Sequence, residues 1–420
     1  MLLVSTAQRG YNNFNFSSVL GQQTGASNAT PHIYKICLTG GPCAGKTTAL
    51  TYLQQVLSQK GFRVFCVPEA ATLLMKGGAM INVSTFAFNQ AVKFQTSLMK
   101  TQMSLEDHFT ELAKNENLPS VILCDRGLMD GSAYVSEELW SAVLDEVGLS
   151  HMQLRDKRYD GVIHMVTAAD GASSFYNKGN EARYENLKQA VDVDRRLRHA
   201  YLGHSRFFIV DNSVSHFNSK IDKCVDIVSK IIGFPSPSNH HKKFLIRISN
   251  PEDHASLGFP PECKIDTFEV IETIIKPYPQ GNSQEDIEIY LRKRQFINAY
   301  SYTQEIRYTT NHQRIVKSRI ITAREYLELI QQKMPTLNTL QKRRTSFVYE
   351  NQAYTIETIL NIEGQPTFLR AETHSDDSFT IPPFISVVKD VTSQKLYSSP
   401  NLAHVDFKYQ QLPELAGPAV

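Results

Sequence analysis

KICLTGGPCAGKTT, residues 35–48, places an apolar segment directly before a glycine-rich turn and a run that can begin a helix. Within it, Gly40 to Thr47 fits the spacing G-x-x-x-x-G-K-[ST], between a strand predicted at Tyr34–Thr39 and a helix predicted at Lys46–Gln59. Glycines at both ends let the backbone curl around an anion, so that amide hydrogens and the helix N-terminus face it. The stretch therefore predicts a phosphate-binding loop of consecutive residues: Gly40, Gly41, Pro42, Cys43, Ala44, Gly45, Lys46, Thr47 and Thr48.

Two side chains of this loop indicate what the phosphate belongs to. Lys46 is placed to reach the β- and γ-phosphates of a nucleoside triphosphate, and the Thr47 hydroxyl is placed to bind Mg²⁺. The alternative is a glycine-rich turn with an accidental lysine, and the strand–loop–helix context argues against it. We therefore expect a P-loop domain over residues 31–235, with a nucleotide and Mg²⁺ as its ligands.

The rest of this half alternates apolar strands with amphipathic helices, a pattern typical of a parallel α/β sheet. The further strands are predicted at Arg63–Val67, Val121–Asp125, Gly161–Thr167 and Phe207–Val210. The further helices are predicted at Thr85–Lys114, Glu137–Glu146 and Ser215–Ile232.

Polar residues follow two of these strands, at the sheet edge where ligands bind. Asp125 ends one strand and is a candidate ligand of Mg²⁺, either directly or through water. Arg126 beside it is placed to meet a substrate or a phosphate, and Glu69, just after another strand, is placed to orient a hydroxyl or a water. These three are the candidate catalytic residues. A cap at Asp125 and a structural role for Glu69 are the alternatives.

The stretch Glu181–His204 is rich in arginine, and it resembles the lid of P-loop kinases of the nicotinamide riboside and deoxynucleoside kinase kind. That resemblance implies that Arg183 and Arg195 close over the triphosphate; a solvated helix face is the alternative. Asp211 and Asn212 follow the last strand and are candidates to contact the base. The guanine-reading motif N-K-x-D is missing, so the sequence alone does not choose between GTP and ATP.

Composition sets broad limits on the chain. A length of 420 residues favours two domains, and 41% hydrophobic with 20% charged residues is typical of an ordinary globular protein. The net charge of +2 gives no sign of a nucleic-acid partner. Six scattered cysteines without a C-x-x-C pair fit a reducing, cytoplasmic setting. No apolar stretch approaches the roughly 20 residues that span a bilayer.

The domain plan follows from local changes in composition. Residues 1–30 are rich in Ser, Asn, Gln and Gly and predict a disordered leader, with a transit peptide as the alternative. Gly233 to His241 reads as a linker. A second domain is expected over residues 236–395, mostly of strands with one helix at Ala323–Lys333, and a flexible tail over residues 396–420.

The second domain carries basic residues in an i, i+2 spacing that places both members on one face of a strand. Twelve basic and three acidic residues lie between Leu291 and Ser346. Cations on three strands cannot face an apolar core, so we expect them to line a phosphate-binding cavity; an exposed polar sheet face is the alternative. The candidates are the pairs Arg292/Arg294, Lys317/Arg319 and Lys342/Arg344, with Lys243, Arg247 and Lys276 beside them. Candidate carboxylate partners are few, chiefly Glu272 and Glu372.

The order of these pieces resembles the CYTH, or triphosphate-tunnel, fold, an antiparallel barrel. That family opens with E-x-E-x-K; here Lys243 matches the lysine, but Asn239 and His241 replace both metal-binding glutamates. The loss of both glutamates argues against metal-dependent triphosphatase chemistry, but it leaves the anion-binding surface of the fold intact.

The whole chain from about residue 31 to 395 resembles the TRPL translocation defect protein family, on LTGGPCAGKTT, the DRG turn and YLRKRQ. The resemblance implies a GTP-binding protein that also binds phosphatidylinositol 3-phosphate. It implies a cytoplasmic protein recruited peripherally to endosomal membranes, where it supports trafficking of a channel. The main expectation is thus a nucleotide switch or weak NTPase. The alternatives are a small-molecule kinase and a polyphosphate hydrolase of the tunnel fold.

Overall fold

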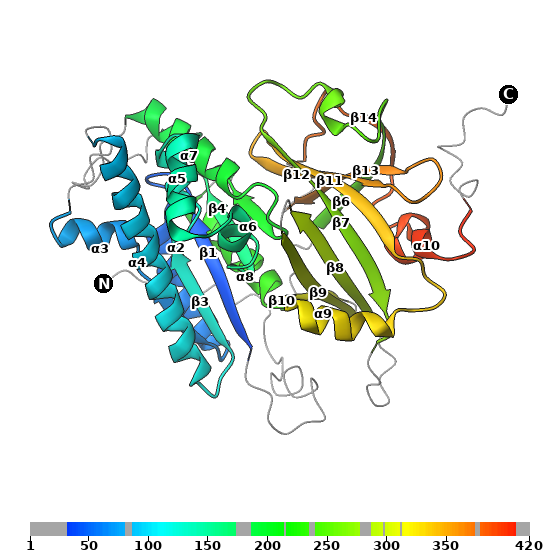
Figure 1. Ribbon diagram of the computed structural model, residues 1–420, viewed down its shortest axis with the longest axis horizontal. Helices are drawn as coiled ribbons and strands as arrows, with labels where there is room; N and C mark the ends of the chain where they lie inside the picture. The colour runs from blue at the N-terminus through cyan, green and yellow to red at the C-terminus, as the bar shows by residue number, and fades with distance from the viewer. Residues whose placement is uncertain are drawn as a thin grey trace.

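The computed structural model describes residues 32–79, 86–173, 186–213, 216–234, 240–277, 287–296, 299–310, 313–373 and 379–408. Two halves lie side by side, each built around its own sheet (Figure 1). The predicted leader, residues 1–30, lies outside the described residues.

The first half is built on a five-stranded parallel sheet in the order β2-β3-β1-β4-β5. β1 lies at its centre and pairs with β3 on one side and β4 on the other. The prediction of a parallel α/β sheet is confirmed. The strands are β1 (Ile33–Thr39), β2 (Arg63–Val67), β3 (Ser120–Asp125), β4 (Gly161–Met165) and β5 (Phe207–Val210).

Helices cover both faces of this sheet, because its strands are apolar on both sides. Ile36 and Leu38 of β1 pack with α2 (Lys46–Gln59) and α8 (Phe217–Ile231), whereas Cys37 faces the opposite layer. That opposite layer contains α4 (Phe88–Lys114), α5 (Glu137–Val147) and α6 (His151–Arg155). Short helices α3 (Ala70–Lys76) and η3 (Asp130–Tyr134) and the longer α7 (Leu187–Ala200) complete the half.

The second half is a nine-stranded sheet in the order β10-β9-β8-β7-β11-β12-β13-β6-β14, and each neighbouring pair runs antiparallel. The sheet bends, so that β6, β12 and β13 cross above β8 and β9 (Figure 1). Its strands are β6 (His240–Arg247), β7 (Ile265–Ile275), β8 (Glu288–Phe296), β9 (Ala299–Thr310), β10 (Gln313–Ile321), β11 (Leu340–Tyr349), β12 (Gln352–Ile359), β13 (Thr367–Thr373) and β14 (Ser386–Asp390).

The chain after residue 390 corrects one prediction. The predicted flexible tail begins at residue 396, but α10 (Ser399–Ala403) is part of the core. Tyr397, Leu402 and Ala403 are buried in a cluster with Leu245. A five-residue helix is too short to show a hydrophobic period in the sequence, so its burial is evident only from the fold. The predicted helix at Ala323–Lys333 is the shorter α9 (Ala323–Leu329), followed by a 3-10 turn.

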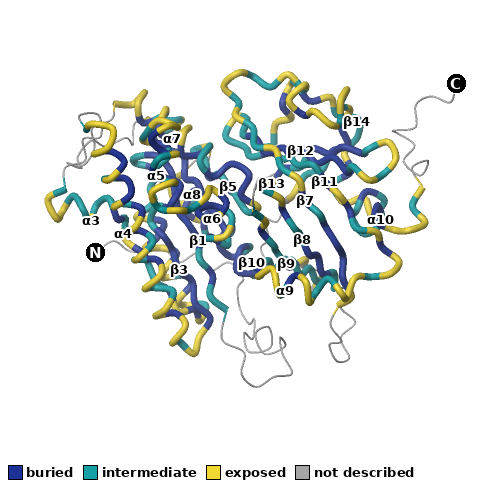
Figure 2. Tube along the Cα trace, viewed as in Figure 1, coloured by how far each residue is buried: buried dark blue, intermediate teal, exposed yellow. Residues whose placement is uncertain are grey.

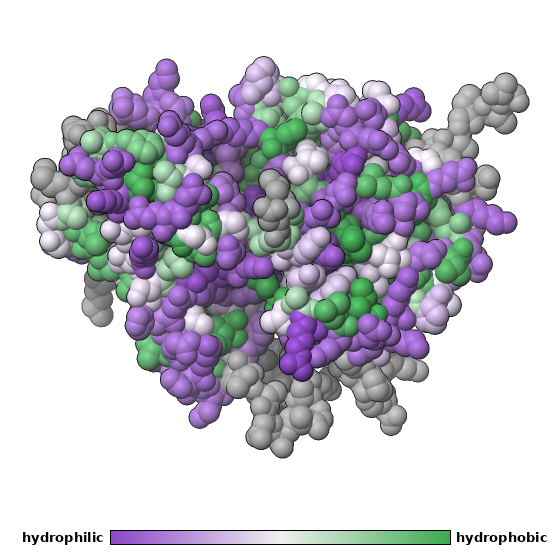
Figure 3. Space-filling view, in the orientation of Figure 1, coloured by the Kyte–Doolittle hydropathy of each residue, from purple (hydrophilic) through white to green (hydrophobic). Residues whose placement is uncertain are grey.

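Burial follows the two sheets, with exposed residues concentrated on outer helices and loops (Figure 2). Hydrophilic residues cover most of the visible face, with apolar patches scattered among them (Figure 3). In the part of the chain that the structure describes, no helix combines the length and the apolar character needed to cross a membrane.

Candidate nucleotide site and ionic cluster

The loop between β1 and α2 has the backbone that its glycines predict. Gly40 has φ 137° and Gly45 has φ 91°, both in the region that glycine adopts readily. A Cβ on Gly40 would lie 2.0 Å from the carbonyl oxygen of Met165 in β4. Cys43 also has positive φ, at 55°. Gly40 is therefore required both by the turn and by its close approach to the next strand.

Lys46 folds back over this loop. Its Nζ donates to the carbonyl oxygens of Gly40, at 2.8 Å, and Gly41, at 2.9 Å. Burial, helped by the neighbouring Arg126, lowers the pKa of Lys46 to about 8. Thr47 and Thr48 are exposed in the first turn of α2. A phosphate that takes the Lys46 amine must compete with two carbonyl groups, and its negative charge favours the protonated form of this buried lysine.

The three candidate catalytic residues lie together at the carboxyl ends of β2 and β3. Arg126, at φ 76°, donates through Nε to Glu69 Oε1 at 3.0 Å and through Nη1 to the Gly40 carbonyl at 2.8 Å. Its Nη1 also lies 3.3 Å from Asp130 Oδ2. Arg126 thus links the phosphate loop to Glu69. Asp130 belongs to this group, and sequence reasoning missed it.

Asp125 fits a role beside a cation. Burial, with nearby Glu69 adding to it, raises the pKa of Asp125 although Lys46 opposes the shift. When burial disfavours the charged form of a carboxylate, a divalent ion beside it stabilises that form. Thr47 near the start of α2 and Asp125 at the end of β3 remain the candidate residues for holding Mg²⁺ with a bound triphosphate. Among the described residues, no group of three or more His, Cys, Asp or Glu side chains forms a metal site by itself.

A second carboxylate, that of Asp194, holds the phosphate loop at Gly41. Asp194, in α7, accepts from the Gly41 amide at 2.8 Å and from the Thr167 amide at 2.9 Å. Its Oδ2 lies 3.1 Å from His164 Nε2 and 3.2 Å from Arg198 Nε. Burial alone would raise the pKa of Asp194, but His164, Arg198 and the Gly41 amide hold it well below its usual value. Its carboxylate therefore stays charged and fixes Gly41.

The sequence did not single out Asp194, although it lies inside the predicted lid. The available signal was its i, i+4 spacing from Arg198 on one helix face. Arg195, the candidate named for the lid, is exposed, and Arg183 lies outside the described residues.

The two candidate base-contacting residues have partners within the protein. The Asn212 amide nitrogen donates to the carbonyls of Thr167, at 2.8 Å, and Asp170, at 2.6 Å, while its Oδ1 accepts from Lys220 at 2.8 Å. The Asn212 side chain therefore ties the loop after β4 to α8. Asp211, in turn, lies 3.6 Å from Lys223 and accepts from Ser213 at 2.8 Å.

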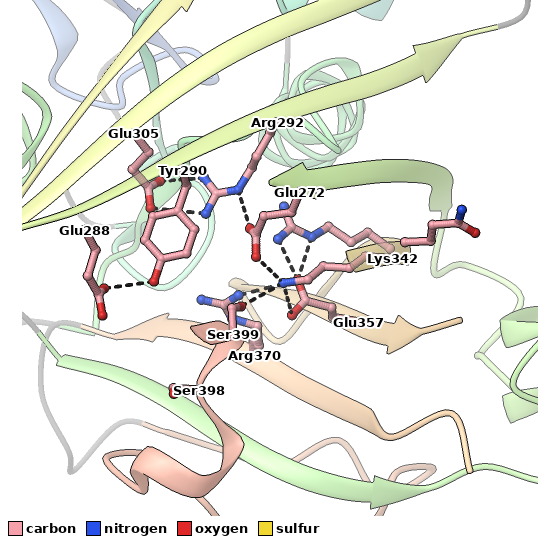
Figure 4. Close-up of polar contacts among 12 residues, drawn as sticks. Glu272, Glu288, Tyr290, Arg292, Glu305, Lys342, Glu357, Arg370, Ser398 and Ser399 are labelled. Carbon is pink, nitrogen blue, oxygen red and sulfur yellow. Dashed lines mark hydrogen bonds and ion pairs between the residues drawn. The ribbon is translucent and has the colours of Figure 1, made fainter. Parts of the chain in front are cut away.

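In the second half, basic and acidic side chains from several strands meet in one group, which we call the central ionic cluster (Figure 4). Arg292 contacts Glu272 at 2.7 Å and Glu305 at 2.6 Å. Lys342 contacts Glu272 at 2.7 Å and Glu357 at 3.5 Å. We define the cluster as Glu272, Arg292, Glu305, Lys342, Arg344, Glu357 and Arg370, since Arg344 and Arg370 also reach Glu357, at 2.5 and 3.5 Å.

The carboxylates of this cluster are charged partners, because burial would raise the pKa of Glu357 but Lys342, Arg344 and Arg370 hold it well below its usual value. The prediction named the cations Arg292, Lys342 and Arg344 but expected few carboxylates near them. Glu305 and Glu357 are the partners it missed.

Lys243 lies against the end of the cluster. Its Nζ is 3.8 Å from the Phe368 ring centroid and donates to the Tyr397 carbonyl at 2.6 Å. Burial, then Arg370, lowers the pKa of Lys243 to about 7.

The remaining predicted anion-binding residues lie elsewhere, so the three basic pairs do not converge on one cavity. Arg294 reaches the first half and contacts Asp156 at 2.7 Å. Arg319 contacts Glu325, in the first turn of α9, at 2.9 Å. The others are Lys317, which lies against Gly233; Arg247 and Lys276, which are exposed; and Glu372, which pairs with Lys230 of α8.

Comparison with known proteins supports the assignment of the first half as a nucleotide-binding domain. Residues 35–218, less than half of the chain, match a family model described as an AAA domain. Residues 35–218 are a P-loop-type nucleotide-binding domain. No curated protein matches the sequence.

Two solved structures share a weak likeness with part of the chain. One, titled the hypothetical protein NE1496, has 17% identity and a TM-score of 0.27, covering 39% of this chain and 97% of its own. Another, titled the inorganic triphosphatase NE1496, has 16% identity and a TM-score of 0.26, covering 39% of this chain and 93% of its own. Similarity at this level supports no argument about fold or function.

Proposed function

We propose that residues 40–47 bind a nucleoside triphosphate with Mg²⁺ and that the chain acts as a nucleotide-dependent switch or weak NTPase. The observation that carries this proposal is the loop itself, with glycine-only backbone at Gly40 and Gly45 and with Lys46 curled over it. Amide groups of the loop and the start of α2 bind the phosphates. Lys46 neutralises the β- and γ-phosphates, and Thr47 and Asp125 hold Mg²⁺.

The test is direct titration of the full chain with Mg²⁺–GTP and Mg²⁺–ATP. Replacing Lys46 by Ala removes a charge-assisted contact worth roughly 1.5–3 kcal/mol, so affinity falls at least about tenfold. Lys60→Ala, at the other end of α2, is the matched control and stays within about twofold of wild type. An unchanged affinity in Lys46→Ala contradicts the assignment.

The resemblance to the TRPL translocation defect family extends this proposal to GTP. Since Asn212 is occupied by backbone and Lys220 contacts, Asp211 or the lid would have to select guanine. Equal affinity for GTP and ATP in the same titration contradicts a guanine preference. Asp211→Asn, a nearly isosteric change, is expected to reduce the ratio of the two affinities.

The same resemblance leads us to propose that the second half binds phosphatidylinositol 3-phosphate and supports endosomal trafficking of a channel. The central ionic cluster and Lys243 supply cations of the kind that a phosphate headgroup needs. Sedimentation with vesicles of phosphatidylcholine, with and without this lipid, tests the claim. Inorganic triphosphate tests the other source of phosphate, and phosphate release from it favours a polyphosphate hydrolase.

One observation favours a kinase as the second candidate. Glu69, Asp125 and Arg126 lie beside the phosphate loop, where an acceptor hydroxyl would approach. Burial would raise the pKa of Glu69, but Arg126 and Thr72 lower it overall, so the group is a charged acceptor at neutral pH. Transfer of phosphate from ATP to a nucleoside tests this alternative. Loss of transfer in Glu69→Gln, with nucleotide affinity retained, assigns the proton-accepting role.

A further inference from the structure

A buried arginine connects the phosphate loop to the second sheet. Arg198 lies in α7, with 7% of its side chain exposed, and its Nε is 3.2 Å from Asp194 Oδ2. Its Nη1 donates to the Oδ1 of Asn351. Asp194 in turn holds the Gly41 amide at 2.8 Å. Two side chains therefore separate the loop from a residue of the other half.

Asn351 lies in the turn that connects β11 and β12. Glu350 and Asn351 form the two-residue connection between β11 and β12, with φ of 45° and 60°. Both residues thus have the left-handed backbone of a tight hairpin. β11 carries Lys342 and Arg344, and β12 carries Glu357, so the hairpin is one end of the strands that hold the central ionic cluster.

The loop near Gly41 is held from two directions. Asp194 accepts from its N–H, while Lys46 donates to the carbonyls of Gly40 and Gly41. A phosphate that takes the Lys46 amine removes the second hold, and the contact with Asp194 then carries more of the loop's fixation. The contact of Asp194 with the Gly41 N–H does not involve Lys46, so it can hold Gly41 in place while the nucleotide is bound.

We propose that Arg198 couples the two halves, so that its contact with Asn351 strengthens nucleotide binding at the P-loop and nucleotide binding stiffens the β11–β12 hairpin. The second effect follows from the first because coupling between two sites is reciprocal. This inference rests on the proposed nucleotide binding. It deepens that function by giving the second half a way to sense the state of the first.

The test uses three variants of one turn. Asn351→Gly removes the acceptor for Arg198 and keeps a residue suited to positive φ. Glu350→Gly makes the same backbone change at the neighbouring exposed position and leaves the Arg198 contact intact. Asn351→Asp tolerates the same backbone and restores an acceptor. Calorimetric titration with Mg²⁺–GTP and Mg²⁺–ATP is expected to show about three- to tenfold weaker binding for Asn351→Gly alone.

Hydrogen exchange gives the reciprocal measurement. Mg²⁺–nucleotide is expected to slow amide exchange at residues 349–352 in wild type and in Glu350→Gly, but not in Asn351→Gly. Equal affinities in the two glycine variants, or exchange that does not respond to nucleotide in wild type, overturn the coupling alone. Failure of wild type to bind either nucleotide removes the proposed function and the coupling with it.

Discussion

Replacing Arg294 by Ala is expected to loosen the contact between the two halves. Arg294 of β8 donates to Asp156 at 2.7 Å, to the Gly203 carbonyl at 2.6 Å and to Asp266 at 3.2 Å. Its guanidinium carbon also lies 3.4 Å from the Phe268 ring centroid. Burial lowers the pKa of Arg294 to about 10, so it stays charged at neutral pH.

The expected loss of unfolding free energy follows from the two carboxylates that Arg294 no longer pairs with. Without Arg294, Asp156 and Asp266 share only Arg155, which lies 2.9 and 3.1 Å from them. Breaking a buried pair costs about 3–5 kcal/mol of unfolding free energy. Asp266 is one-third exposed, at 33%, so water screens part of its charge and we expect about 3 kcal/mol, the lower end of that range.

Urea unfolding followed by the fluorescence of Trp140, the single tryptophan, reports on the first half, where Trp140 is buried in α5. Far-ultraviolet circular dichroism reports on both halves, and the two transitions are expected to separate in Arg294→Ala. The control is Lys264→Ala, which cuts an exposed 3.4 Å ion pair with Glu137 and costs at most about 1 kcal/mol. If Arg294→Ala unfolds like this control, Arg294 does not hold the halves together.

Three further predictions concern the loop, acid stability and the ionic cluster. Gly40→Ala is expected to abolish nucleotide binding in a titration, because the new Cβ meets the adjacent strand; retained binding would show that the loop adapts. Burial lowers the pKa of His204 and of His254 to about 4, so the stability that each contributes is present above about pH 6.5 and is lost as pH falls toward 4. Urea unfolding at pH 7 and pH 5 should differ by up to about 2 kcal/mol for His204, and a His204→Gln variant should show a smaller difference. Arg370→Ala is expected to weaken binding of inorganic triphosphate more than Arg292→Ala does, and the opposite order in a titration contradicts entry of the anion at the Arg370 end of the cluster.

The parallel sheet could be predicted almost residue by residue, because its strands are short apolar runs buried on both faces. β2 and β5 begin and end at the predicted residues, Arg63–Val67 and Phe207–Val210. β4 ends at Met165, two residues before the prediction, and Thr167 instead donates to the Pro42 carbonyl at 2.5 Å. The apolar pattern continues into this loop, so the pattern alone gives no sign of the strand end.

The candidate nucleotide site could be predicted only where its residues are consecutive or follow a strand. The phosphate loop, Glu69 and Asp125 satisfy this condition. Asp194 does not, because the amide that it accepts from, Gly41, is 153 positions away in the chain. A buried helical aspartate becomes informative only when the fold brings its partners to it.

The second sheet shows the same limit for charge. Alternation revealed that Arg292 and Lys342 face one side of their strands, but the partner of each cation lies on a neighbouring strand. Glu272 is directly opposite Arg292 in the β7–β8 pairing, and Glu357 lies on β12 next to β11. Partners set by register cannot be counted from one strand's sequence, so the spacing predicts a basic cavity where the structure has paired charges.

This pairing determines where an anion can bind in the second half. Arg292 contacts two carboxylates, and Lys342 is almost fully buried between Glu272 and Glu357, so a phosphate near either cation meets negative charge at short range. These carboxylates keep their charge at neutral pH, since the surrounding cations hold the pKa of Glu357 well below its usual value. Arg370 differs: it is 33% exposed, reaches Glu357 only at 3.5 Å and lies opposite Lys243 in the β13–β6 pairing. If the second half binds an anionic headgroup or triphosphate as we propose, we expect it to enter at the Arg370 end, because Arg370 is the most exposed cation of the cluster.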